Sequence, residues 1–457
     1  MIRALKLQIE RDGAILRLSW PIVGGMLSQT MVNLVDTAMV GRLGASSLAA
    51  VGLGATATWL SVSLLLGIGS ATQALVARRM GENRPLEAGR TLDHALLLGS
   101  ISGVVMGLAI YLLTPSMFRL LTTDGEVLHQ GTNYLQMRTI GFPFVVLNFA
   151  FRGFYHGIGD TWTYLKAIAV TNILNAVLDL LLIFGLAGFP RMGAQGAGLA
   201  TALGLAGGTL YYVAWASWRT GIRRRFGALT LFRRRRGDDP VCSRSCFSLV
   251  SILVANGLQN LGTALGFMLL SWMMARISTV AVAINNVLMN VSSIFHLPAL
   301  GLGLAAATLV GQSLGRREPA EAAAWGWETV RLATYLLAAG GLLLVLLPGP
   351  VMRAFTDDPA VLQQGQLAVQ VLGLLQFSTA VTMVLSNVLV SAGSARWVAL
   401  VNTGVTYLVV LPLVYLLCVM HGGGVALAWV LQGLGRLVIG VALMLRFHGG
   451  VWKQNRI

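Results

Sequence analysis

Charged residues are scarce in this chain of 457 residues: they make up 11% of it, against roughly 25% in a typical soluble domain. Hydrophobic residues reach 56%, the mean hydropathy is +0.73, and 54 residues are glycine, which is commoner in transmembrane helices than in soluble ones. A water-soluble protein of this length needs more charge on its surface. The composition therefore excludes soluble enzymes, DNA-binding proteins and secreted disulfide scaffolds, and it indicates a polytopic helical membrane protein.

Cysteine and lysine are rare as well. Cys242, Cys246 and Cys418 are too few for a disulfide framework, and no histidine lies near the first two, so we expect free thiols and no zinc site there. The lysines are Lys6, Lys166 and Lys453. None of them follows a glycine as in a phosphate-binding loop, which argues against ATP-driven transport. We expect no cofactor and no enzymatic activity.

Long apolar stretches separated by short polar breaks predict the membrane-spanning helices. A spanning helix needs about 20 mainly apolar residues. The predicted spans are 15–40, 48–77, 92–114, 131–155, 163–187, 193–218, 246–274, 280–311, 328–348, 363–391, 397–419 and 422–446. The preceding segment, 1–12, lacks the pattern of a signal peptide and predicts a short amphipathic cytoplasmic helix. The expected fold class is an all-α polytopic membrane protein with twelve transmembrane helices.

The arginines predict the orientation of these helices. With the N-terminus inside, most basic residues fall in inner segments, above all between Arg219 and Arg244, and the outer loops carry few. The net charge of +16 is therefore an orientation signal, aided by anionic membrane lipid, and we expect no nucleic-acid partner. Both termini are predicted to be cytoplasmic. Arg138 and Arg436 remain within or near spans, where snorkelling or ion pairing is expected and substrate contact is the alternative.

The chain resembles itself when it is shifted by 234 residues without gaps. Matching residues in loops are Gly81 with Gly315, Pro85 with Pro319, Arg119 with Arg353, Asp124 with Asp358 and Gly159 with Gly393. Because six helices separate the repeats, both halves have the same orientation, and the axis relating them lies along the membrane normal. We expect an N-lobe at 1–218, a basic cytoplasmic linker at 219–245 and a C-lobe at 246–457, with the substrate path between the two pseudo-symmetric six-helix lobes.

Of the 17 acidic residues, only Asp36 and Asp179 fall well inside predicted spans. A carboxylate at the centre of a spanning helix costs about 2.5–3.5 kcal/mol on insertion scales, so such a residue usually has a partner or a function. Asn175 lies one helical turn before Asp179, and Thr201 lies in the outer half of the following span. These oxygens could together bind Na⁺, or the carboxylates could share a proton. The alternative is that each Asp only hydrogen-bonds to its neighbours.

Four segments resemble the multidrug and toxic compound extrusion (MATE) family. They are Trp20-Pro21, the run Val35-Asp36-Thr37-Ala38-Met39-Val40-Gly41, the run Leu48-Ala49-Ala50-Val51-Gly52, and the pattern of Asn172, Asn175 and Asp179. The resemblance covers essentially the whole chain and implies the two-lobed fold of the MOP superfamily. It also implies multidrug efflux by antiport, in which small-molecule drugs or toxic organic cations leave a bacterial cell through its inner membrane as H⁺ or Na⁺ enters. A monomer of the NorM or DinF type is expected.

The resemblance also assigns roles to residues. Asp36, Asn175, Asp179 and Thr201 match the N-lobe cation site of the family, which would hold Na⁺ if sodium is the coupling ion. Tyr134 matches a position near that site, Asn172 belongs to the same helix pattern, and Pro21 matches a proline linked with helix bending.

The second lobe departs from the NorM pattern because its spans 249–272 and 372–389 contain no acid. That favours coupling through the N-lobe, as in DinF-like relatives. Polar or adaptable residues that could line the substrate cavity are Gln29, Met31, Asn33, Gln259, Asn260 and His296. A packed, hydrogen-bonded histidine is the alternative for His296.

Two other functions fit less well. A flippase for lipid-linked precursors, on a related two-lobed architecture, would need a strongly cationic cavity for phosphates, whereas the charges inside the spans are chiefly two acids. An intramembrane aspartyl protease would need YD and GxGD motifs, but Asp36 follows a valine and Asp179 follows a leucine.

Overall fold

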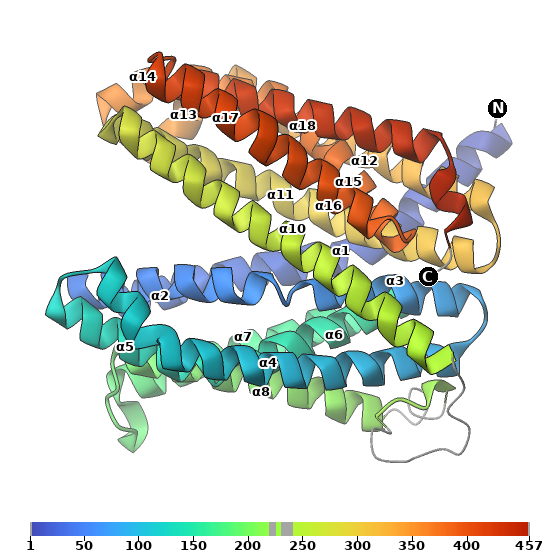
Figure 1. Ribbon diagram of the computed structural model, residues 1–457, viewed down its shortest axis with the longest axis horizontal. Coiled ribbons are helices and arrows are strands. Elements are labelled where there is room, and N and C mark those ends of the chain that lie inside the picture. The colour runs from blue at the N-terminus through green and yellow to red at the C-terminus, as the bar shows by residue number, and fades with distance from the viewer. Residues whose placement is uncertain (1, 219–224, 230–240, 456–457) are drawn as a thin grey trace. The chain divides into compact units, whose positions relative to one another are not determined.

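The computed structural model is almost entirely helical and describes residues 2–218, 225–229 and 241–455 (Figure 1). Most of the predicted basic linker, including Arg233–Arg236, lies outside the described residues. Cys246 and Cys418 are free thiols, as expected, while the side chain of Cys242 is outside the described part. The chain forms two compact units, one of residues 24–257 and one of residues 1–23 with 258–457.

Eight helices follow one another along the first half of the chain. They are α1 (Ile2–Gly41), α2 (Ala45–Ser63), α3 (Gly67–Gly81), α4 (Pro85–Leu121), α5 (Gly125–Thr139), α6 (Phe142–Ile158), α7 (Thr161–Phe184) and α8 (Ala194–Trp218). The second half contains α10 (Val241–Ile277), α11 (Thr279–Gly315), α12 (Pro319–Leu346), α13 (Pro348–Arg353), α14 (Pro359–Leu374), α15 (Gln376–Ser391), α16 (Ala395–Val405), α17 (Leu411–Val414) and α18 (Gly424–His448). Two π-helical segments, Thr406–Val410 and Tyr415–Met420, continue α16 and α17, and together they form one span, Ala395–Met420.

Every predicted span lies on helices, which confirms the all-α polytopic class. Within the described residues, nine helices are long and apolar enough to cross a membrane, or ten if α14 and α15, bent by 46°, count as one span. The two remaining predicted spans are helical but less uniformly apolar. The span at 15–40 carries Gln29, Asn33 and Asp36 on α1, and the span at 131–155 is divided between α5 and α6.

The segment 1–12 is not the separate short helix that the sequence predicts, because α1 runs on without a break from Ile2 to Gly41. Its polar side chains are tied to α12 instead. Arg11 pairs with Glu328 at 2.8 Å and Asp12 with Arg331 at 2.7 Å. Through these two ion pairs the N-terminal part of α1 is bound to α12.

The internal repeat predicted at 234 residues is visible in the helix caps. Asp124 caps α5 by accepting a hydrogen bond of 2.8 Å from the Glu126 amide, and its own amide donates to Thr122 Oγ1 at 3.1 Å. Asp358 caps α14 in the same way, with the Ala360 amide at 2.9 Å and Thr356 Oγ1 at 3.2 Å. An aspartate at this position satisfies amides that the first turn of a helix leaves free.

Backbone angles repeat as well. Gly159 ends α6 with φ 85° and Gly393 follows α15 with φ 82°, a left-handed conformation that glycine adopts without steric cost. Asn83 and Arg317 precede α4 and α12 with φ 59° and 63°, although neither is a glycine. The turn is therefore conserved between the halves even where the side chain is not.

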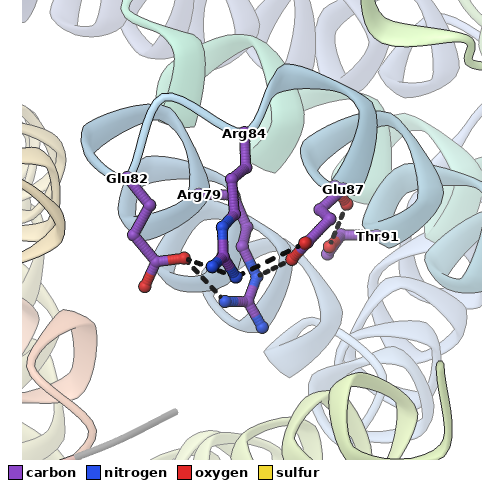
Figure 2. A network of polar contacts seen from close by, with 5 residues as sticks. All are labelled: Arg79, Glu82, Arg84, Glu87 and Thr91. Carbon is purple, nitrogen blue, oxygen red and sulfur yellow. Dashed lines mark hydrogen bonds and ion pairs between the residues drawn. The ribbon is translucent and has the colours of Figure 1, made fainter. Parts of the chain in front are cut away.

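Ion pairs stabilise the turns that precede α4 and α12. Figure 2 shows the first network, in which Arg79 reaches Glu82 at 2.8 Å and Glu87 at 3.1 Å, while Arg84 lies 3.8 Å from Glu82 and 3.4 Å from Glu87. At the equivalent turn Arg316 pairs with Glu318 at 2.8 Å. Glu82 and Arg84 correspond to Arg316 and Glu318, so the signs of the pair are exchanged between the halves.

The residue ranges of the two compact units differ from those of the predicted lobes. The differences lie in α1 and α10, the first helix of each half. Residues 1–23 of α1 pack with the second half of the chain, and the part of α10 that ends at Gly257 packs with the first half. A Cβ at Gly67 would clash with the Leu253 carbonyl oxygen, and one at Gly301 would clash with Val23. Gly67 on α3 therefore allows α10 to pack closely at Leu253, and Gly301 on α11 allows α1 to pack closely at Val23.

Candidate functional site

The carboxyl groups of Asp36 on α1 and Asp179 on α7 lie within hydrogen-bonding reach of each other. Asp179 is 0% exposed, and Asn175 Nδ2 donates a hydrogen bond of 3.0 Å to its Oδ2. The Oδ1 atoms of both aspartates are buried and have no hydrogen-bond partner in the described structure. Two facing carboxyls with free lone pairs form a site that a proton or a small cation can occupy.

The sequence of α7 places this site. Its cap, Asp160, accepts a hydrogen bond of 3.2 Å from the Thr163 amide. Asn172, Asn175 and Asp179 then follow at spacings of three and four residues, so they share one helical face. On α8, a Cβ at Gly204 would lie 3.0 Å from the Asn175 Cβ, so the glycine lets the two helices approach closely.

Tyr134 and Arg138, one turn apart on α5, lie beside the carboxyl pair. Tyr134 is 2% exposed, and its ring packs against Gly54 of α2. Arg138 Nη1 donates a hydrogen bond of 2.6 Å to the Tyr134 hydroxyl, and the charge of Arg138 acts on both aspartates. The sequence predicted snorkelling or ion pairing for Arg138, with substrate contact as the alternative, and did not place it at the carboxyl site. The available signal was its spacing of four residues from Tyr134, which puts both on one face of α5.

The other predicted members of the site have different partners. Asn172 Nδ2 donates a hydrogen bond of 2.8 Å to Ser28 Oγ, so it ties α7 to α1 two turns away from Asp179. The Thr201 hydroxyl donates to the Ala197 carbonyl at 2.9 Å, which leaves its oxygen lone pairs available. Pro21 lies inside α1, close to where the helix passes from one compact unit to the other.

The predicted substrate-cavity residues are divided between the two units. In residues 24–257, Gln29 Nε2 donates to Asn33 Oδ1 at 3.2 Å, and Met31 is 59% exposed. In the other unit, Gln259 and Asn260 are half-buried on α10, and His296 is half-buried on α11. A common cavity formed by all six remains a prediction.

The donors present fit a hard cation or a proton better than a transition metal. Among the described residues, no cluster of three or more His, Cys, Asp and Glu side chains is arranged to hold a metal ion. Asp36, Asp179, Asn175 and Thr201 would offer carboxylate, amide and hydroxyl oxygens, the ligand types that hard cations prefer.

Comparison with known proteins agrees with this architecture. The MatE family model matches the chain twice, at residues 21–181 and 256–416, once in each half. A probable multidrug resistance protein NorM from Thermotoga maritima is 24% identical over 97% of this chain and 93% of its own length. The multidrug resistance protein PmpM from Pseudomonas aeruginosa is 26% identical over 85% of this chain and 80% of its own length.

Among solved structures, an outward-facing multidrug resistance MATE family transporter of the MOP superfamily superimposes with a TM-score of 0.85. It is 23% identical, and the match covers 96% of this chain and 97% of that one. The two-lobed helical fold and the repeated matches define a multi-pass membrane protein of the transporter class. This chain belongs to the MatE family.

Proposed function

We propose that this protein is a secondary multidrug transporter that exports small-molecule drugs or toxic organic cations in exchange for a coupling ion. The contact between Asp36 and Asp179 carries the proposal, because two carboxyls inside a membrane can face each other only if a proton or a cation offsets their repulsion. The names of the relatives, which are multidrug resistance proteins, support the substrate class.

A proton is the coupling ion that the contacts favour. A hydrogen bond between two carboxyls needs one proton between them, and the guanidinium of Arg138 already supplies positive charge nearby. Na⁺ would need several oxygen ligands, and Asn175 turns its amide nitrogen, not its oxygen, toward Asp179. Sodium remains the competing outcome of the test below.

The coupling step follows from the position of Asp36 on α1. Binding of one ion reduces the negative charge of the carboxyl pair and changes how tightly the C-terminal part of α1 holds to α7. Pro21 gives α1 a place to bend. With both termini cytoplasmic in a bacterial inner membrane, an exchange that moves one net charge inward through 100 mV gains about 2.3 kcal/mol, enough for a drug gradient of some tens-fold.

The test uses purified protein in liposomes loaded with a fluorescent organic cation. A pH gradient and a Na⁺ gradient are imposed separately, and efflux is followed over time. We expect the pH gradient to drive efflux and the Na⁺ gradient to have little effect. Efflux driven only by Na⁺ would reassign the ion, and equal efflux without any gradient would contradict antiport.

The matched variants are Asp36→Asn and Asp358→Asn. The first removes a carboxylate from the pair and is expected to reduce gradient-driven efflux to the level of dye-loaded liposomes that contain no protein. The second removes a carboxylate from the α14 cap, where asparagine caps equally well, and should transport like the wild type. Normal efflux by a folded Asp36→Asn protein would exclude the carboxyl pair as the coupling site.

A further inference from the structure

A second intramembrane charge, Arg436, lies at the midpoint of α18 and plays no part in the site described above. Its side chain is half-buried. Residues 246–315 and 359–455 contain no Asp or Glu at all. Within the described part of the chain, no ion pair joins Arg436 to a carboxylate, whereas Arg11 and Arg331 of the same unit are both paired. The ion-pairing role expected from the sequence is therefore not met.

A position at the middle of the span also rules out the snorkelling that the sequence suggested, because the side chain would have to cross about half of the membrane to reach water. A guanidinium carries five N–H donors. Its one hydrogen bond to a described residue is a long one, from Nη1 to Thr379 Oγ1 at 3.4 Å. A guanidinium at this depth in the span, with most of its N–H donors unpaired, indicates a binding site for a ligand.

Two glutamines, each one helical turn from Thr379 or Arg436, also have buried polar atoms without partners. Gln376 lies one turn before Thr379 on the same face of α15, is 1% exposed, and neither atom of its amide has a hydrogen-bond partner. On α18, Gln432 lies one turn before Arg436, and its Nε2 atom is likewise buried without a partner. Buried amides of this kind are rare, because each costs the free energy of its lost hydration.

A third helix adds a further polar group. His296 of α11 lies close enough to Arg436 for the charge to act on its ring. The helices fit closely here, since the Leu375 side chain packs on Gly433 and the Thr382 hydroxyl donates to the Arg436 carbonyl at 3.3 Å. Thr379 of α15 and His296 of α11 thus lie near one guanidinium of α18, and no ion pair compensates its charge in the part of the chain that the structure describes.

We propose that Arg436, with Gln376, Thr379 and His296, forms the subsite that binds the carboxylate group of those transported substrates that carry one. Arginine suits this role because its planar fork binds both oxygens of a carboxylate, and the amides and the hydroxyl complete the hydrogen bonding. The inference rests on the proposed drug export, but it concerns equilibrium binding and needs no ion gradient.

The experiment compares two ligands that differ by one carboxylate, rhodamine B and its ethyl ester. Their binding to purified protein in nanodiscs of phosphatidylcholine is measured by fluorescence anisotropy. Arg436→Gln is expected to weaken rhodamine B binding about tenfold or more, the effect of losing a charge-assisted hydrogen bond, and to change ester binding less than about twofold. Arg436→Lys should recover only part of the affinity because the bidentate geometry is lost.

The matched control is Arg446→Gln on the same helix, where the guanidinium lies over the Trp397 ring at 5.5 Å. This variant should bind both dyes like the wild type. Thr379→Val keeps the shape of the side chain and should weaken rhodamine B binding to a smaller extent. It provides the test of the site if Arg436→Gln does not fold. Equal losses for the acid and the ester, or no loss for either in a folded variant, would overturn the proposal.

A lipid phosphate could use the same donors, so the measurement is repeated in nanodiscs that contain phosphatidylglycerol. If the carboxylate preference survives, the substrate assignment holds. If anionic lipid abolishes it, and the lipid no longer competes in Arg436→Gln, the site belongs to a lipid headgroup and the substrate assignment is overturned. Failure of ion-driven efflux would leave these binding results unchanged, so the two proposals fail separately.

Discussion

Arg138 Nη1 donates a 2.6 Å hydrogen bond to the Tyr134 hydroxyl, and this contact restrains a guanidinium whose charge reaches both Asp36 and Asp179. The guanidinium also lies 5.7 Å from the Tyr134 ring centroid, over its face. If the arginine were free to turn, it could form an ion pair with the carboxyls and displace the coupling ion. We therefore expect the tyrosine to position Arg138 beside the carboxyl pair.

Removing that hydroxyl gives a direct test. Tyr134→Phe keeps the buried ring but releases Arg138, and we expect gradient-driven efflux to fall several-fold while the protein remains folded. The measurement is dye efflux from liposomes, with Tyr335→Phe as control because Tyr335 is 67% exposed on α12. If Tyr134→Phe transported at the wild-type rate, the tether would have no role in coupling.

The hydrogen bond between Asn172 and Ser28 should contribute to stability. In membrane proteins such interhelical bonds contribute on average about 0.6 kcal/mol. We expect Asn172→Ala and Ser28→Ala each to lower the free energy of unfolding, and the double variant to lose less than the two effects added together. Unfolding in mixed micelles measures this cycle, and strictly additive losses would show that the two side chains do not interact.

Close packing at Gly67 predicts a steric cost. A Cβ there would meet the backbone oxygen of Leu253, which cannot move aside as a flexible side chain can. Gly67→Ala should lower stability by about 1–3 kcal/mol, seen as a lower thermal midpoint in detergent. Gly52→Ala on α2 is the control, since nothing lies within 4 Å of the added Cβ, and it should be neutral or stabilising. A neutral Gly67→Ala would contradict the close approach of α10 to α3.

The paired caps predict matching losses in the two halves. Asp124→Ala removes hydrogen bonds from the Glu126 and Val127 amides, at 2.8 Å and 3.1 Å, and Asp358→Ala removes one from the Ala360 amide at 2.9 Å; each should cost about 1 kcal/mol. Asparagine at either position should restore most of the stability. Thermal unfolding of the four variants checks this, and a loss at only one position would mean that the caps are not equivalent.

Much of the fold could be predicted because a few residue types mark where helices begin and end. Asp124 and Asp358 precede helices, Gly159 and Gly393 follow them, and Pro85 and Pro319 are the first residues of α4 and α12, so a simple shift of the sequence finds the matching positions. The carboxyl pair could also be predicted, because an acid in an apolar span is conspicuous.

What could not be predicted depends on how helices rotate against one another. Arg138 is adjacent to Asp36 and Asp179 only because α5 turns one face toward them, and a single sequence does not give that angle. The sequence predicted snorkelling or an ion pair for Arg436, and only the three-dimensional structure shows that none of the described carboxylates forms an ion pair with it. The exchanged signs of Glu82–Arg84 and Arg316–Glu318 hide their equivalence from any comparison of identities.

The first turns of α1 and α10 belong to the unit built mainly from the opposite half of the chain. Each half of the chain thus supplies a helix segment to the compact unit built mainly from the other half, as a swapped element does in a domain-swapped dimer, except that here one chain contains both. Cutting the linker would therefore not release two self-sufficient domains, since each fragment would keep a piece of helix that completes the other.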